Sequence, residues 1–254
     1  MTRPGIAALL LLLLTPAAEA RSLAALQARG TLELCAHPNA LPFSSRADNP
    51  PGFQIELGRA LAKELGLSLT PVWIVTTSQI RAAGCDIILD AIADQQAQEE
   101  TGLKLGRPYY RSGVVLAVRP ESPVRAYRDL GAHNRVGVQV GSVAAMTLDG
   151  RGVPISVFGF EDDILQGLAG GDIDAAAVTP VAAGFYNAGH PGDALRLVHP
   201  DGSVPALSWN VSVGMKAPDE ALRRAVDDAM ARLAERGVLQ GIYGRYGVTL
   251  QPPE

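Results

Sequence analysis

The chain has 254 residues, of which 47% are apolar, and its 22 Lys and Arg residues stand against 26 Asp and Glu residues for a formal net charge of −4. The basic residues are scattered, so the sequence predicts no basic face and excludes nucleic acid as a partner. A chain of this length buries a sizeable core and forms one large domain or two lobes.

The first twenty residues are predicted to be a secretory signal peptide rather than part of the fold. Arg3 gives a basic start, residues 6–14 are an apolar run with six consecutive leucines, and residues 18–20 read Ala-Glu-Ala. This is the three-part pattern of a secretory signal with cleavage after Ala20. The apolar run of about ten residues is too short to span a bilayer, which takes roughly 20. We therefore expect an exported, periplasmic protein that does not insert into the membrane after cleavage, and an uncleaved anchor is the alternative.

A βαβ unit opens the mature chain. Residues 31–36 are predicted to form a buried strand that stops at Pro38, and an amphipathic helix at 53–65 and a strand at 67–74 follow. In such a unit the loop after the first strand, which here ends on Phe43, faces the ligand crevice.

The next segments extend this first series. A short helix at 78–83 leads to a third buried strand at 85–92, and the polar stretch 93–106 is predicted to be mostly loop. A strand at 114–118 ends at Arg-Pro-Glu-Ser-Pro, residues 119–123, which breaks the pattern and is the first hinge candidate.

A second α/β series follows, and the chain then returns to the first. We predict strands at 135–140, 155–158, 172–178, 195–198 and 208–214, and helices at 127–130, 142–148, 161–168, 181–187 and 219–236, with a last short helix that reaches Tyr246. The fold class is therefore α/β with two lobes, residues 21–118 plus 208–254 and residues 119–207. Two crossings, near 118–120 and 207–209, make a two-strand hinge that suits closure around a ligand.

The two cysteines, Cys35 and Cys85, lie at or near predicted strands. An oxidising compartment allows a disulfide between them, and two buried free thiols are the alternative. Neither has a CxxC partner or a clustered His, so we predict no metal site.

An ordered set of segments resembles the family 3 extracytoplasmic solute-binding proteins over almost the whole mature chain. The matching segments are residues 32–36, 42–43, 52–56, 84–88, 108–110, 136–142 and 171–175. The resemblance implies a type II periplasmic binding protein fold with a ligand cleft between the lobes, and as one role the substrate-binding subunit of an ABC importer.

A narrower resemblance joins residues 35–44, 84–86, 107–112 and 180–186 to the J-type accessory proteins of methanol oxidation. Those binding-protein-like chains accompany periplasmic PQQ-dependent alcohol dehydrogenases, and a Cys35–Cys85 pair belongs to their pattern. This sequence departs from that pattern in a shorter segment from Trp73 to Gly84 and in Val178-Thr179 where Trp-Gly is usual.

The family resemblance also suggests what the cleft does not bind. Amino-acid-binding members hold the ligand carboxylate with an arginine and the ammonium with an aspartate, positions that fall here on or next to Gln98 and on Thr179. Both charges are missing, so we expect no zwitterionic α-amino acid. The remaining candidates for the cleft are aromatic and small polar residues, namely Phe43, Trp73, Tyr109, Tyr110, Gly141, Ser142 and Thr179, with Gln98.

These candidates have ordinary alternatives. Gly141 and Ser142 precede a helix whose N–H groups suit an anion or a carbonyl oxygen, but Ser142 equally fits a plain N-cap. The aromatic residues equally fit core packing.

No catalytic motif or cofactor fingerprint occurs, and the four histidines are far apart. We therefore predict a protein without catalysis or cofactor. The leading hypothesis is an accessory that contacts a quinoprotein alcohol dehydrogenase or its cytochrome, and the alternative is an ABC-importer receptor for a small non-zwitterionic solute. A remote third, a dehydratase with Asp90 or Asp94 as acid or base, needs a cleft carboxylate with a raised pKa.

Overall fold

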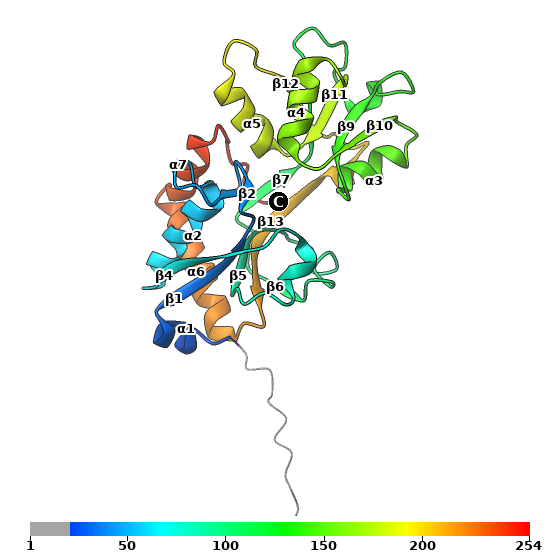
Figure 1. Cartoon of the computed structure of the whole chain (residues 1–254). Helices are drawn as coiled ribbons and strands as arrows, with labels where there is room; N and C mark the ends of the chain where they lie inside the picture. The colour runs from blue at the N-terminus through cyan, green and yellow to red at the C-terminus, as the bar shows by residue number, and fades with distance from the viewer. Residues whose placement is uncertain (1–20) are drawn as a thin grey trace, which may run out of the picture.

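A computed structural model describes residues 21–254, and the expected signal peptide lies outside the described residues. The described chain forms two α/β lobes, one above the other in Figure 1, which confirms the predicted two-lobed fold. Within this part of the chain, no helix is long and apolar enough to cross a membrane.

Lobe 1 is built on a six-stranded mixed sheet in the order β4-β1-β5-β13-β6, with β7 also paired to β13. Its strands are β1 (Thr31–Ala36), β4 (Ser68–Trp73), β5 (Ile87–Ile92), β6 (Leu103–Leu105), β7 (Tyr110–Gly113) and β13 (Ser208–Lys216). β1 is parallel to β4 and β5, whereas β13 is antiparallel to its neighbours. The helices are α1 (Leu23–Arg29), α2 (Phe53–Glu64), α6 (Glu220–Glu235), α7 (Val238–Arg245) and the 3₁₀ turn η1 (Thr77–Ile80), and a small ribbon pairs β2 (Asn39–Ala40) with β3 (Ser44–Ser45).

Lobe 2 is built on a five-stranded sheet in the order β10-β9-β11-β8-β12. Its strands are β8 (Val115–Val118), β9 (Val136–Gln139), β10 (Ile155–Phe158), β11 (Ala175–Val178) and β12 (Arg196–Val198). Its helices are α3 (Val143–Asp149), α4 (Glu161–Gly170) and α5 (Pro180–Gly189), with 3₁₀ turns η2 (Tyr127–Asp129) and η3 (Pro205–Leu207). β9, β10 and β11 are mutually parallel, and β8 runs antiparallel to β11 and β12.

The α6 helix shows how the sequence sets these elements. Asp219 caps its first turn by accepting a hydrogen bond from the N–H of Leu222 at 2.7 Å. Its apolar residues recur at helical spacing, so Leu222, Val226 and Leu233 all point into the lobe 1 core.

Six short elements were not predicted from the sequence, namely α1, β2, β3, β6, β7 and η3. α1 was not predicted at all, and β6 lies inside the polar stretch 93–106 that was predicted to be loop. β7 was not predicted either; like β6, it pairs with β13. These two strands are too short to show an alternation of apolar and polar residues in the sequence. They form because β13 supplies their hydrogen-bonding partners.

The two lobes are joined where the chain passes from β7 to β8 and from η3 to β13 (Figure 1). At this crossing the N–H of Val114 donates to the carbonyl of Leu207 at 2.9 Å, so the two hinge segments are in direct contact. β8 pairs only within the five-stranded sheet. We therefore propose residues 21–113 plus 208–254 as lobe 1 and 114–207 as lobe 2, in place of the expected boundary at residue 118.

The α5 helix adds a further contact between the lobes. Val181 packs in the lobe 1 core and Phe185 lies 5.9 Å from Tyr246 between ring centroids. Gly184 approaches Gly247 so closely that a Cβ at residue 184 would lie 2.5 Å from the Gly247 carbonyl oxygen. A helix that belongs to lobe 2 by its strand connections thus rests directly on lobe 1.

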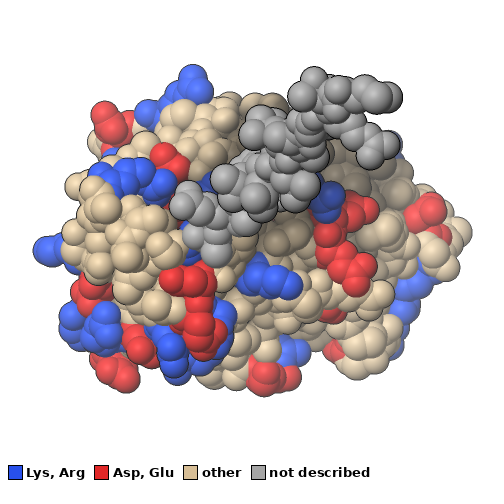
Figure 2. Space-filling view, turned by 90° about the horizontal axis from the view of Figure 1, so that it is seen from below, with Lys and Arg blue, Asp and Glu red and all other residues tan. Residues whose placement is uncertain are grey.

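Acidic and basic side chains are interspersed on the face of the molecule that Figure 2 shows. Several charged side chains of the described residues form ion pairs, such as Arg232 with Glu64 at 3.1 Å. Exposed pairs of this kind contribute little to stability because water and salt screen them.

Candidate functional site

The candidate site is the cleft at which the parallel strands of both lobes end. β1, β4 and β5 in lobe 1 and β9, β10 and β11 in lobe 2 each lead into a loop or helix start on this side. In α/β sheets, ligands bind beyond the carboxyl ends of the parallel strands. Residues that follow these strands are therefore the candidates for ligand contact.

In lobe 1, a carboxylate without a basic partner occupies this edge. Asp90, in β5, has a left-handed backbone with φ 56°. Its Oδ1 accepts hydrogen bonds from the hydroxyls of Tyr109 (2.9 Å), Tyr110 (3.0 Å) and Tyr243 (2.8 Å), and its Oδ2 accepts one from Gln54 Nε2 (2.9 Å). Burial raises the pKa of Asp90, and the four hydrogen bonds oppose that rise.

This network accounts for the two predicted tyrosines. Tyr110 is only 4% exposed and packs in the lobe 1 core, and Tyr109 lies partly buried against the same cluster. Burial and the Asp90 charge raise the pKa of both hydroxyls well above their usual value, so each stays a hydrogen-bond donor. The two side chains hold Asp90 in place.

The other two predicted aromatic residues lie in different surroundings. Phe43 is half-buried against Phe53, with ring centroids 5.2 Å apart. Trp73 ends β4, is also half-buried, and has the guanidinium carbon of Arg46 5.5 Å from its ring centroid. Trp73 is thus placed at the cleft edge of the sheet, whereas Phe43 joins the packing of the first loop.

Gln98 turns into its own loop. It is 7% exposed, its Nε2 donates to the carbonyl of Ile92 at 3.1 Å, and its Oε1 accepts from the Thr101 hydroxyl at 3.0 Å. Residues 93–102 contain no Lys or Arg, but they do contain Asp94, Glu99 and Glu100. No basic side chain of this loop therefore replaces the carboxylate-binding arginine of the family pattern.

In lobe 2, Gly141 and Ser142 form an N-cap. The Ser142 hydroxyl accepts from the N–H of Ala145 at 3.1 Å and so satisfies the start of α3. Gly141 has a φ of 68°, which a glycine adopts without strain. The N-cap alternative therefore describes these two residues.

Thr179 binds a second carboxylate that has no basic partner. Its hydroxyl caps α5 by accepting from the N–H of Ala182 at 3.2 Å, and donates to Glu161 Oε2 at 2.8 Å. The Thr179 N–H donates to Glu161 Oε1 at 2.6 Å. Burial raises the pKa of Glu161, the bonds from Thr179 oppose the rise, and the neighbouring charge of Asp162 adds to it.

The sequence did not indicate Glu161 as a candidate site residue. It indicated Asp90 only as the acid or base of the remote dehydratase alternative. Acidic residues are common in the first turn of a helix, so the sequence around Glu161 indicates a helix start and no functional role. Only the fold places Glu161 beside the end of β11 and Asp90 under three tyrosines from distant segments.

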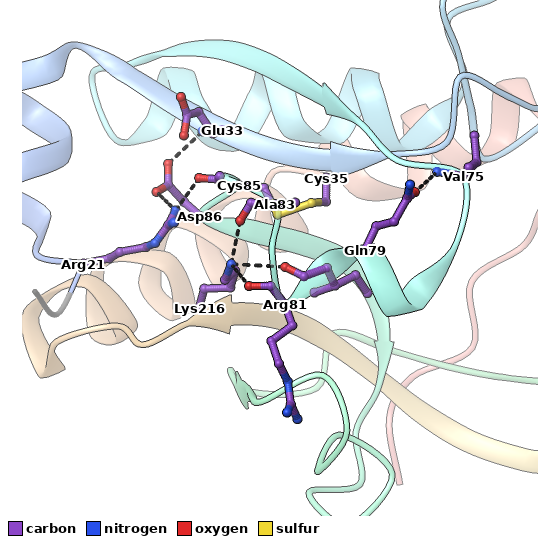
Figure 3. Close-up of a disulfide and its surroundings, with 12 residues drawn as sticks. Arg21, Glu33, Cys35, Val75, Gln79, Arg81, Ala83, Cys85, Asp86 and Lys216 are labelled. Carbon is purple, nitrogen blue, oxygen red and sulfur yellow. Dashed lines mark hydrogen bonds and ion pairs between the residues drawn. A yellow bond between two sulfur atoms is a disulfide. The ribbon is translucent and has the colours of Figure 1, made fainter. Parts of the chain in front are cut away.

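The disulfide expected from the narrower resemblance is present. Cys35, in β1, is bonded to Cys85, just before β5, with a Cα–Cα distance of 5.3 Å (Figure 3). Lys216 of β13 donates to the carbonyls of Ile80 (3.1 Å), Arg81 (2.9 Å) and Ala83 (2.6 Å). The disulfide and Lys216 together fix the segment that follows Trp73.

Three of the five exposed large apolar residues directly follow strands that lead to the candidate site. Val75, Val140 and Phe160 follow β4, β9 and β10 within two residues and are 58%, 65% and 44% exposed. Met146 and Val157 lie nearby in sequence, on α3 and β10. Phe160 also contacts His37 of lobe 1 edge-on, with ring centroids 5.8 Å apart.

Two cavities are lined by residues other than the exposed apolar residues Val75, Val140 and Phe160. One of about 550 Å³ lies behind the hinge strands and is covered by residues 251–254, where Arg111 pairs with Glu254. One of about 510 Å³ lies between the lobes, lined by Pro42 and Arg245 on one side and by α4 and α5 on the other. Within residues 21–254, no group of side chains has the composition of a metal site.

Comparison with known proteins gives a family match along nearly the whole chain. The model of the bacterial extracellular solute-binding proteins, family 3, matches residues 32–249. The L-cystine-binding protein TcyJ of Escherichia coli (strain K12) is 26% identical over 229 residues, 84% of this chain and 81% of that protein. The lysine/arginine/ornithine-binding periplasmic protein of the same strain is 26% identical over 223 residues, 81% of this chain and 83% of that protein.

Solved structures agree on the fold. An amino acid ABC transporter substrate-binding protein from Streptococcus pneumoniae, bound to L-arginine, superposes with a TM-score of 0.72 at 18% identity, covering 91% of this chain and 98% of that one. The ancestral amino acid-binding protein AncCDT-1, a precursor of cyclohexadienyl dehydratase, superposes with a TM-score of 0.73 at 20% identity, covering 89% and 99%. At these identities the likeness shows the fold alone.

Proposed function

This chain belongs to the bacterial extracellular solute-binding proteins, family 3, and we propose that it is the periplasmic substrate-binding subunit of an ABC importer for a small solute that is not a zwitterionic amino acid. The hinged cleft between two lobes carries the proposal, because such a cleft closes on a ligand and presents a changed shape to a partner. The importer role is preferred to the dehydrogenase accessory role, because the two Escherichia coli relatives are binding proteins for small solutes.

The solute class follows from two positions in the cleft. Gln98 is uncharged and turned into its own loop, so it does not replace the arginine that holds a ligand carboxylate, whereas the Glu161 carboxylate on Thr179 leaves a negative charge at the other position. The cystine, lysine, arginine and ornithine in the names of the two Escherichia coli relatives are all α-amino acids. We therefore do not transfer those ligands to this chain.

The test is to identify a bound solute directly. The protein, purified from the periplasm without refolding, is examined by native mass spectrometry for an added mass, and candidate solutes are ranked by thermal shift and calorimetry. A small-molecule adduct that raises the unfolding temperature supports the importer role. Tight binding of an unmodified α-amino acid contradicts the solute class.

A second candidate is the accessory of a PQQ-dependent dehydrogenase, and the apolar cleft mouth favours it. Val75, Val140 and Phe160 are exposed on both lobes, and an apolar rim of this kind suits contact with a protein. Capture of a quinoprotein dehydrogenase or its cytochrome at equal stoichiometry, lost in the variant Val140→Ser/Phe160→Ser, supports this role. Solute uptake that depends on this protein, without capture of a dehydrogenase or its cytochrome, excludes the accessory role.

We propose no catalysis, although the dehydratase alternative gains one feature. Asp90 and Glu161 both have a raised pKa, which a proton-transferring carboxylate needs. Both carboxylates are committed to hydrogen bonds within their own lobes, and the neighbouring loop has no basic residue to hold a substrate carboxylate. Loss of a hydroxy acid from solution on incubation with the purified protein contradicts this assignment.

A further inference from the structure

Residues 246–254 follow α7 and run to β7 and β13, the strands that lead into the two crossings between the lobes (Figure 1). The first part of this segment is fixed to lobe 1, because Val248 belongs to the lobe 1 core and Leu250 packs against the same cluster. Beyond Leu250, residues 251–254 are exposed and lie along β7. Their contacts are all with residues of the hinge region, as the following distances show.

The first anchor of residues 251–254 is on β7. The N–H of Arg111 donates to the carbonyl of Gln251 at 2.9 Å in an antiparallel bridge, and the Arg111 guanidinium pairs with the Glu254 carboxylate. The Nε of Arg111 also donates to the hydroxyl of Ser208, the first residue of β13, at 2.9 Å. Arg111 therefore links β7, β13 and residues 251–254.

The second anchor is on β13. Asn210 Nδ2 donates to the backbone oxygen of Glu254 at 2.7 Å, and the N–H of Glu254 donates to Asn210 Oδ1 at 3.2 Å. Pro252 and Pro253 lie between the two anchored residues, and their fixed φ angles leave little chain freedom to lose when the segment binds. An exposed ion pair alone contributes little, but the reciprocal amide bonds and the backbone bridge hold the same four residues.

These anchors lie next to the hinge. Arg111 is three residues before Val114, whose N–H donates to the Leu207 carbonyl at 2.9 Å. The cavity of about 550 Å³ is lined by residues 251–254 and also by Pro180 and His199 of lobe 2. Residues 251–254 are thus fixed to lobe 1 and face lobe 2 across this cavity. A turn of lobe 2 about the crossing changes the space between lobe 2 and these residues.

We propose that residues 251–254 form a strap that limits how far the lobes turn about the hinge. The strap ties β7 to β13 where both strands leave lobe 1, so the crossing bends less freely, and it stands in the space beside lobe 2. In a hinged binding protein, the range of lobe angles sets the fraction of molecules that can bind, so the strap also tunes the affinity for a solute. The restraint itself does not depend on which solute binds.

Deleting residues 251–254 tests the strap on the protein without solute. Spin labels on Lys63→Cys in α2 and Asp149→Cys in α3 report the distance between the lobes, because the native cysteines are bonded to each other. Double electron–electron resonance should give a distance distribution about 1.5-fold or more wider than that of the parent. The Arg111 N–H loses its acceptor and should exchange with solvent about tenfold or more faster.

An unchanged distance distribution overturns the proposal. This holds even if the Arg111 amide exchanges faster, since residues 251–254 then bind to the hinge strands without restraining the lobes. An unchanged exchange rate at Arg111 shows that the segment is not bound there, and overturns it as well.

Two arginine variants form a matched pair that keeps the whole backbone. Arg111→Gln loses the ion pair with Glu254 and should widen the distance distribution, by less than the deletion does. Arg107→Gln loses its ion pairs with Asp227 at 3.7 Å and Asp228 at 2.7 Å, which lie on α6 within lobe 1, and should leave the distribution unchanged. Equal effects of the two substitutions contradict the role of Arg111 as an anchor of the strap.

The strap and the proposed function fail separately. All of these measurements are made without solute, so a strap that does not restrain the lobes leaves the importer role intact. A protein in which no solute is found can still show the wider distribution on deletion, which supports the strap.

Discussion

The contact between Gly184 and Gly247 gives a prediction about how the lobes are set relative to one another. In Gly184→Ala, the new Cβ would lie 2.5 Å from the Gly247 carbonyl oxygen and 3.1 Å from its carbonyl carbon. Neither atom belongs to a flexible side chain, so α5 and the turn after α7 must separate by about 0.9 Å or more to reach ordinary contact.

The energy of this change depends on whether the lobes turn. Alanine within a helix is favoured over glycine by about 1 kcal/mol, and overpacking a fixed contact costs about 1–3 kcal/mol. If the hinge axis runs about one layer, roughly 10 Å, from the contact, a displacement of about 0.9 Å is a rotation of about 5°. Because the hinge is a chain crossing rather than a packed core, we expect the lobes to turn and most of the strain to be relieved.

Spin labels on the two lobes measure this rotation. Lys63→Cys on α2 and Asp149→Cys on α3 are exposed sites in opposite lobes, and both native cysteines are bonded to each other. Double electron–electron resonance should show a displaced and broader distance distribution in Gly184→Ala, with stability within about 1 kcal/mol of the parent.

The control is Gly241→Ala, which lies in α7 with nothing within 4 Å of its added Cβ. It should be stabilised by about 1 kcal/mol without any change in the interlobe distance. If Gly184→Ala behaves in the same way, the Gly184–Gly247 contact does not set the lobe angle, and the reasoning is refuted.

Three further predictions follow from the site. Replacing Cys35 and Cys85 by alanine opens a loop of 50 residues and should lower stability by about 4 kcal/mol in chemical denaturation, whereas an unchanged midpoint contradicts the loop-entropy argument. Lys216→Met removes the donor for three carbonyls and should speed amide exchange in residues 77–84 and cost about 1–3 kcal/mol, with exposed Lys104→Met as the control. Because burial raises the pKa of Glu161, the native state binds more protons than the unfolded state between about pH 4, the unfolded value, and the raised folded value, so stability falls as pH rises through that window. Glu161→Gln should therefore gain stability relative to the parent as the pH rises through that window, and a constant difference contradicts the raised pKa.

Much of the fold could be predicted from periodicity and caps. The strands Thr31–Ala36 and Ile155–Phe158 have the predicted bounds, and α6 lies inside the predicted 219–236 with Asp219 and Arg236 as its caps. These segments carry their own signal, because alternation, apolar runs and capping residues act within a few positions.

The elements that were missed depend on partners far away in the chain. β6 and β7 are strands because β13 pairs with them, although about a hundred residues separate them in sequence. The first lobe boundary has the same origin, since only the pairing of β8 with β11 and β12 assigns residues 115–118 to the second sheet. An apolar run such as Val115–Val118 fits the core of either lobe equally well.

The candidate site is harder to predict from the sequence, because it depends on whether each carboxylate has a basic partner in the fold. Asp86 and Asp90 lie four residues apart around one buried strand, and nothing in the local sequence distinguishes them. The fold gives Asp86 two arginines from around α1 and gives Asp90 three hydroxyls and an amide. The tyrosines that the sequence suggested as ligand contacts instead hold Asp90. The same holds for Thr179, which the sequence suggested as a ligand contact and which in the structure binds the Glu161 carboxylate. Whether a carboxylate has a basic partner is visible only when every neighbour has been placed, and the described partners of Asp90 and Glu161 are neutral side chains.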